Sequence, residues 1–179
     1  MTIIEYLEDI RKIISDLPVG DINRIVSALD EARQKGNRVY VMGNGGSATT
    51  ASHIAGDLNK TCRLKAQALT DSNYLITGLA NDEGYEEIFS KQLERLVQKN
   101  DVVIAISGSG NSKNILKGVE TANKLKCLTI GLCGCCSGEG GALAKKALFS
   151  LIVPSKIMEQ VEDIHLMIGH MLVTELKGI

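Results

Sequence analysis

Two glycine-rich loops, each between an apolar run and a helical pattern, constrain the fold of this chain most. Residues 39–42 run into Gly-Asn-Gly-Gly-Ser at 43–47, and residues 102–106 run into Ser-Gly-Ser-Gly-Asn-Ser at 107–112. Short runs of β-branched residues are typical of strands buried in a parallel sheet. Glycines let backbone N–H groups face a ligand, and the following helix adds unpaired N–H groups and the positive end of its dipole. Either loop alone can be an ordinary strand-to-helix turn, but the two together favour an anionic ligand.

The rest of the chain alternates strand and helix after an all-helical start. Helical spacing covers residues 2–16, and a second helix is expected from Asp21 as N-cap to about Gln34, with Gly36 ending it. Strands are predicted at 38–42, 66–69, 102–106, 127–132 and 148–153, and helices at 47–58, from 71, at 84–97, 112–124, 141–146 and 157–177. This order predicts an α/β fold with a doubly wound, five-stranded parallel sheet, whose ligand lies at the carboxyl ends of the strands.

The length and net charge of the chain exclude some classes of function. A chain of 179 residues fits one domain, 1–179, and a net charge of −1 without a basic block argues against nucleic acid or membrane as partner. The N-terminus lacks the features of a signal peptide and no apolar run is long enough to span a membrane, so a cytoplasmic protein is expected. The apolar stripes of the N-terminal helices, about 2–35, favour packing against another copy, with a helical cap on the same subunit as the alternative.

Five cysteines raise the question of a metal or disulfide. Cys133, Cys135 and Cys136 crowd together, whereas Cys62 and Cys127 stand alone. Their spacing does not match a two-pair zinc site, and the odd count argues against a disulfide framework. We interpret them mainly as loop and strand-end residues, with a functional thiol as the alternative.

Histidines and carboxylates offer a second kind of chemistry. His53 and Asp57 share one helix face, which suits a divalent metal, an acid/base pair or a simple surface hydrogen bond. On the last helix, Glu162 and His170 are about 12 Å apart along the axis and about 80° apart around it, so they either lean toward one ion or serve different sites. His165 is interpreted as a histidine satisfied at a helix interface.

These residues together resemble the sugar isomerase (SIS) domains. The resemblance rests on both glycine loops, His53, Ala80-Asn-Asp82, Glu162-Asp-Ile-His165 and His170. It extends from about residue 35 to the C-terminus and is strongest to the phosphoheptose isomerases, which interconvert sedoheptulose 7-phosphate and a manno-heptose 7-phosphate. It implies a flavodoxin-like sheet, a homotetramer, a phosphorylated sugar as substrate and, as in several members, a zinc ion.

The resemblance also implies roles for individual residues. Substrate contacts would come from Asn44, Gly45, Gly46 and Ser47, sugar hydroxyls would be held by Asn81 and Asp82, and the phosphate by Ser107, Gly108, Ser109 and Ser112. Metal and acid/base positions would be His53, Asp57, Glu162 and His170. The family usually has glutamate at the position of Asp57 and glutamine at that of Glu162. Either Asp57 or Glu162 is therefore expected to be the catalytic base, with His170 relaying protons.

Two other functions compete with an isomerase. A non-catalytic SIS protein that senses sugar phosphates or acts as a scaffold is one, although His53, Asp57 and His170 argue against it. A dinucleotide enzyme is the other, because residues 43–48 match G-x-G-x-x-A. That motif expects an acidic residue about 20 positions later, whereas Asp71 lies 28 positions on, so no nucleotide cofactor is expected.

Overall fold

The computed structural model describes residues 1–136 and 138–179, and it contains the predicted parallel sheet. The strands are β1 Arg38–Met42, β2 Lys65–Ala68, β3 Val102–Ser107, β4 Leu128–Gly134 and β5 Phe149–Val153. The helices are α1 Ile3–Ser15, α2 Val19–Lys35, α3 Gly46–Cys62, α4 Asn73–Asp82, α5 Ser90–Leu96, α6 Lys113–Lys124, α7 Gly141–Lys146 and α8 Met158–Gly178, with a 3₁₀ turn, η1, at Tyr85–Glu87.

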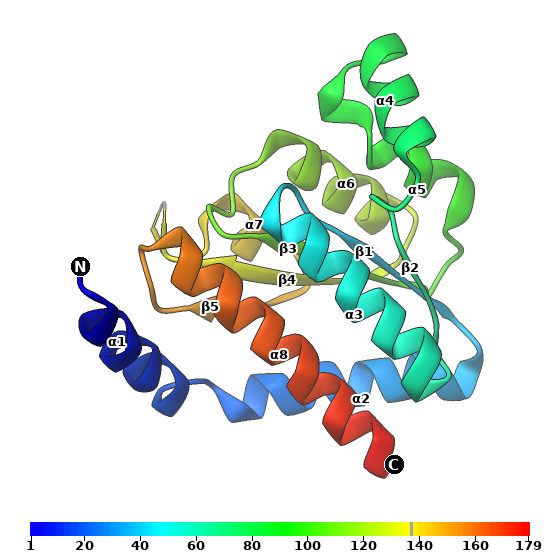
Figure 1. Ribbon diagram of the computed structural model, residues 1–179. Helices are drawn as coiled ribbons and strands as arrows, with labels where there is room; N and C mark the ends of the chain where they lie inside the picture. Colours follow the sequence, from blue (N-terminus) through cyan, green and yellow to red (C-terminus); the bar gives the residue numbers. More distant parts are fainter. Residues whose placement is uncertain (137) are drawn as a thin grey trace.

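The strands pair in the order β2-β1-β3-β4-β5, and all pairs are parallel. The chain reverses its direction of winding between β1 and β3, so the crevice above these neighbouring strands is where an open α/β sheet binds its ligand. Both glycine-rich loops leave the sheet at this crevice (Figure 1). The topology therefore places the two sequence motifs side by side.

Alternation along the strands divides the core into two layers. Val39 and Val41 of β1 pack with α2, α3 and α8, whereas Tyr40 and Met42 pack with α5, α6 and α7. Figure 1 shows α3 and α8 crossing one face of the sheet and α6 the other. No helix in the part of the chain that the structure describes is long and apolar enough to cross a membrane.

Several boundaries differ from the sequence prediction; the helix expected over 47–58, for example, continues to Cys62. Asp21 is not the N-cap of the second helix, because α2 already begins at Val19, after Pro18, and Asp21 lies in its first turn. The helix expected over 84–97 is interrupted: η1 and α5 flank Ile88 and Phe89, which are both fully buried. Gly36 does end α2, in the left-handed conformation that glycine favours.

Candidate functional site

The two loops and two residues of α8 enclose a pocket of about 240 Å³ at the carboxyl ends of β1 and β3. We call it the loop pocket. It is lined by Asn44, Gly45, Gly46, Ser47, Ile106, Ser107, Gly108, Ser109, Ser112, Met158 and Glu162. Eight of the ten substrate-binding residues predicted from the sequence are therefore brought together, with Glu162 beside them. None of the lining residues is Lys or Arg.

Backbone geometry explains why the first loop can serve an anion. Gly45 has φ 53° and ψ −124°, a conformation that side-chain-bearing residues avoid, and it precedes α3 directly. The N–H groups of Gly46 and Ser47 find no hydrogen-bond acceptor among the residues that the structure describes. They therefore point an unsatisfied helix N-terminus at the pocket.

The second loop is held rigidly by its own serines. Ser107 Oγ accepts a hydrogen bond from the N–H of Gly110 at 3.1 Å, and Ser109 Oγ accepts one from Asn111 at 3.2 Å. Ser112 precedes α6 without capping it through its side chain; its Oγ accepts a hydrogen bond from the Ser107 hydroxyl at 3.4 Å, and its own O–H can donate to a ligand. Fixed hydroxyl and N–H donors of this kind suit a phosphate group.

Asn44 is positioned by partners that the sequence pattern did not reveal. Its side-chain amide exchanges hydrogen bonds with that of Asn114, at 2.9 and 2.8 Å, and its Oδ1 also accepts one from the Tyr85 hydroxyl at 3.0 Å. Asn114 lies in α6, and η1 supplies Tyr85. Since these partners are distant in sequence, only the folded structure identifies them.

Glu162 lies directly over the start of α3. A Cβ atom added to Gly46 would approach the Glu162 carboxylate to 2.2 Å, so the absence of a side chain at Gly46 makes room for this acid. Glu162 is the only charged residue that lines the loop pocket. A carboxylate among N–H and hydroxyl groups repels an anion at close range and can act as a base.

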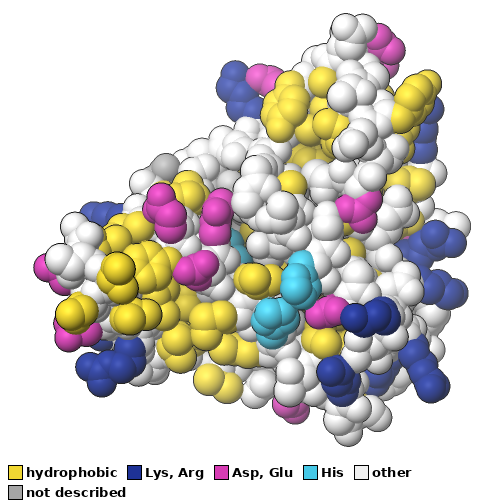
Figure 2. Space-filling model, in the orientation of Figure 1, with side chains coloured by type: hydrophobic (Ala, Val, Ile, Leu, Met, Phe, Trp, Pro, Cys, Tyr) yellow, Lys and Arg dark blue, Asp and Glu magenta, His cyan; other side chains and the backbone are white. Residues whose placement is uncertain are grey.

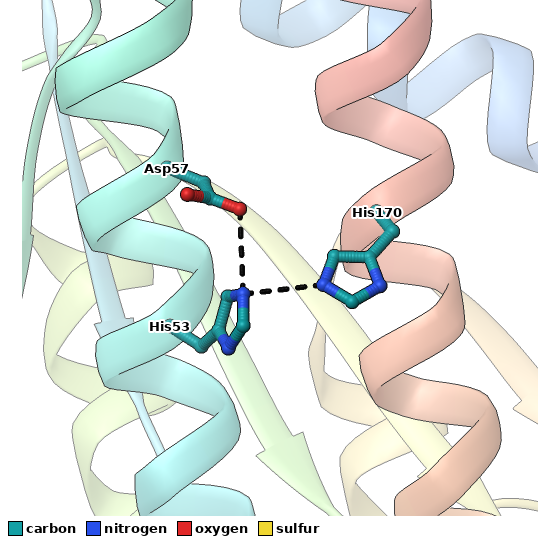
Figure 3. A group of neighbouring side chains, drawn as sticks. All are labelled: His53, Asp57 and His170. Atoms are coloured by element: carbon teal, nitrogen blue, oxygen red, sulfur yellow. Dashed lines mark hydrogen bonds and ion pairs between the residues drawn. The ribbon is translucent and has the colours of Figure 1, made fainter.

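His53, Asp57 and His170 form a separate group between α3 and α8 (Figure 3). His53 Nε2 lies 3.1 Å from His170 Nε2 and 3.4 Å from Asp57 Oδ2. Ligands about 2.0–2.1 Å from a tetrahedral metal ion are about 3.3 Å from one another, and the three ligand atoms here all lie within 4.8 Å of one another, so the group can hold a divalent metal ion. Among the described residues, the metal group comprises only these three; Glu162, expected as a fourth ligand, lies in the loop pocket.

Other predicted residues lie elsewhere. Asn81 and Asp82 are exposed at the end of α4, where the Asn81 amide donates to Asp82 at 2.8 Å, and they do not line the loop pocket. His165 is fully buried with Nε2 3.1 Å from the Cys133 carbonyl oxygen, and burial lowers the pKa of its imidazole to about 4. It is buried against β4, but its Nδ1 has no hydrogen-bond partner among the described residues, so the histidine is only partly satisfied and not fully so as the sequence indicated.

The cysteines are free thiols. Burial raises the pKa of Cys133 to about 12 and that of Cys127 to about 11, so both remain protonated near neutral pH. Neither is suited to nucleophilic chemistry.

Comparison with known proteins identifies the family. The SIS domain profile matches residues 5–134. The chain is 38% identical to a phosphoheptose isomerase of Aquifex aeolicus over 88% of this chain and 83% of that protein. It is 36% identical to a probable phosphoheptose isomerase of Thermoplasma acidophilum, over 94% and 93%. This chain belongs to the SIS domain family, in its phosphoheptose isomerase branch.

A solved structure agrees with this assignment. The phosphoheptose isomerase of Francisella tularensis superposes with a TM-score of 0.89 at 31% sequence identity, over the whole of both chains. The family resemblance and the flavodoxin-like fold expected from the sequence are thereby confirmed, and so is membership of a family of phosphosugar isomerases.

Proposed function

We propose that this isomerase interconverts sedoheptulose 7-phosphate and a manno-heptose 7-phosphate through a cis-enediol(ate). The loop pocket carries the proposal, because it combines neutral phosphate donors with one carboxylate, Glu162, in a chain of the phosphoheptose isomerase family. In this assignment the serine loop anchors the phosphate, and Asn44 lies next to the sugar together with Gly45 and Gly46 at the N-terminus of α3.

Glu162 is our choice for the base. Its carboxylate removes the proton from the carbon next to the carbonyl and returns it to the former carbonyl carbon, while the proton of the neighbouring hydroxyl passes to the former carbonyl oxygen; together these transfers exchange ketose and aldose. Asp57 is the less suitable alternative, because one of its oxygens is 3.4 Å from His53 Nε2 and the other 3.6 Å from Lys60 Nζ. Both oxygens of Asp57 are therefore already engaged by neighbouring side chains.

His53, Asp57 and His170 are assigned to a zinc ion. Two imidazoles and a carboxylate leave one tetrahedral position open, and a zinc ion bound there would polarise a carbonyl or hydroxyl oxygen of the sugar. We assign His170 to the ion and not to a proton relay because its Nε2 faces that of His53.

The chemistry is tested by NMR of sedoheptulose 7-phosphate in D₂O with the pure protein, with and without zinc. New aldose signals are expected, with deuterium at C2 if the abstracted proton exchanges with solvent. An unchanged ketose spectrum under both conditions would contradict the proposed substrate.

The role of Glu162 is tested by Glu162→Gln. We expect kcat to fall at least about 100-fold while zinc affinity is unchanged, since removing a general base costs this much and the metal group does not include it. Glu175→Gln, at an exposed position on the same helix, is the matched control and should keep full activity. Wild-type turnover in Glu162→Gln would assign the base elsewhere.

For the assembly we propose a homotetramer of single SIS domains, each spanning residues 1–179. Support comes from α1, where Ile3, Ile4 and Leu7 are 82%, 70% and 61% exposed, and from α4, which has no buried residue and projects from the body (Figure 1). A second copy that packs on these helices would also bring Asn81 and Asp82 close to a substrate site. We place the enzyme in the cytoplasm, where five free cysteines are stable.

A further inference from the structure

We propose a second anion site, which binds a diphosphate group, at the opposite end of the sheet from the loop pocket. This cationic pocket has a volume of about 400 Å³ and is lined by Arg38, Tyr40, Asn59, Arg63, Leu64, Lys65, Ala66 and Gln67. Arg38 and Lys65 are the paired first residues of β1 and β2. Arg63 follows the last residue of α3.

Distance makes this site independent of the substrate phosphate. Helix α3 begins in the loop pocket and ends at the cationic pocket, and its 17 residues span about 25 Å. A single phosphosugar cannot reach both. Figure 2 shows Lys and Arg side chains gathered on the right-hand side of the molecule, over the ends of α3 and β2, whereas hydrophobic side chains dominate the left-hand side.

The charges of the cationic pocket are not compensated. Arg38, Arg63 and Lys65 are exposed, and none forms an ion pair within the part of the chain that the structure describes. Lys65 only donates to the Gly36 carbonyl oxygen at 3.4 Å. The neighbouring Asp101 carboxylate accepts two backbone N–H groups, from Arg38 and Gln98, each at 2.8 Å. Its charge is thus already stabilised by the backbone.

The conformation of Arg63 is a second, independent observation. It ends α3 with φ 57°, in the left-handed region, where glycine is preferred because it has no Cβ. The corresponding position of α2 is indeed Gly36. Arginine is held here in a conformation that costs more for it than for glycine, and a ligand for its guanidinium would account for that cost. The strained backbone carries the guanidinium on the rim of the pocket.

The number of cations indicates the ligand. A phosphate monoester carries at most two negative charges, whereas a diphosphate carries about three over two linked phosphoryl groups and can contact separated cations. The amides of Asn59 and Gln67 add neutral donors at the same pocket. Inorganic pyrophosphate and a nucleoside diphosphate share this group.

The test is calorimetric titration with pyrophosphate. Arg63→Gly and Lys65→Gln should each weaken binding about tenfold or more, the usual loss for one charge-assisted contact to phosphate. Arg63→Gly should also leave the unfolding temperature unchanged or raise it, because it relieves the left-handed strain. Lys126→Gly is the matched control: Lys126 is an exposed cation with φ 63° outside the pocket, and its loss should leave binding unchanged.

Competing ligands and sites are resolved in the same experiment. Inorganic phosphate should bind more weakly than pyrophosphate. Comparing the affinities for pyrophosphate and ADP identifies the natural ligand. A higher affinity for ADP indicates a nucleoside diphosphate, and a higher affinity for pyrophosphate indicates free pyrophosphate. The double variant Ser109→Ala/Ser112→Ala should retain pyrophosphate binding. Loss of binding in that variant, or equal affinity of Arg63→Gly and wild type, would overturn the proposal.

Discussion

At the scale of single residues, the site depends on a missing side chain. Gly46 begins α3, and the space where its Cβ would lie is occupied by the Glu162 carboxylate from the last helix. The position of the proposed base is thus set by a residue 116 positions earlier in the chain. No sequence pattern within either segment indicates this contact.

Gly46→Ala should therefore reduce turnover without unfolding the protein. The added methyl group meets the flexible end of Glu162, which can move aside but then leaves its place in the loop pocket. We expect kcat to fall about 100-fold, the typical effect of losing a positioned base, with little change in thermal stability. Gly56→Ala on the same helix has no atom within 4 Å of the new Cβ; it should keep activity and stabilise the helix by about 0.5–1 kcal/mol. Equal activity of both variants would contradict this role of Gly46.

His165 gives the fold a specific sensitivity to acid. Its pKa is lowered by burial to about 4, below the ordinary 6.5, so the unfolded chain binds a proton more readily than the folded one between these values. The free energy of unfolding should fall as the pH drops from 6.5 to 4, by up to about 3 kcal/mol from this residue. Denaturant titrations of wild type and His165→Gln across this range should show a shallower pH dependence in the variant, and parallel profiles would contradict the prediction.

At the scale of elements, the metal group exists because α3 and α8 pack unusually closely. A Cβ atom on Gly169 would lie 2.5 Å from Cγ1 of Ile54, and each of these residues precedes or follows a histidine of the group directly. Gly169 therefore allows His53 Nε2 and His170 Nε2 to come within 3.1 Å.

Gly169→Ala should push the two helices apart. We expect weaker zinc binding and a loss of stability of about 1–3 kcal/mol, the usual effect of overpacking a core. Ile54→Ala removes the two atoms that clash, so the double variant should recover zinc affinity relative to Gly169→Ala alone. Zinc titration of the three variants measures this coupling, and additive losses would contradict it.

Much of the element order could be predicted from the sequence, because apolar runs such as 102–106 and loops such as 43–47 carry strong local signals. The loop pocket could be predicted from the same signals, because the carboxyl ends of parallel strands lie at one edge of the sheet and bring the two loops together. Contacts that depend on distant packing could not be predicted. For Glu162 the sequence left open a shared ion with His170 or a separate site, and only the structure shows that it faces Gly46; the Asn114 and Tyr85 contacts of Asn44 have no local pattern.

At the scale of the whole molecule, the apolar face of α1 predicts the assembly. Leu7 is 61% exposed on this helix, next to the similarly exposed Ile3 and Ile4, and burying such a face against another copy is favourable. Light scattering should give about 77 kDa, four times the 19.3 kDa chain, and Leu7→Asp should shift the mass to smaller species. Lys12→Asp, on the same helix, controls for the introduced charge. A wild-type monomer would contradict the proposed assembly.

The lack of Lys and Arg side chains in the lining of the loop pocket has a consequence for how the enzyme works in a cell. Its donors are N–H groups and hydroxyls without a formal positive charge, and short-range contacts of this kind are little affected by dissolved ions, unlike attraction between separated charges. Ketose and aldose would present the same phosphate to this anchor, so it would contribute equally to the binding of both sugars. Neither sugar would then occupy the enzyme preferentially through its phosphate, and the direction of net conversion follows from the concentrations and the equilibrium constant of the two sugars, as with any catalyst.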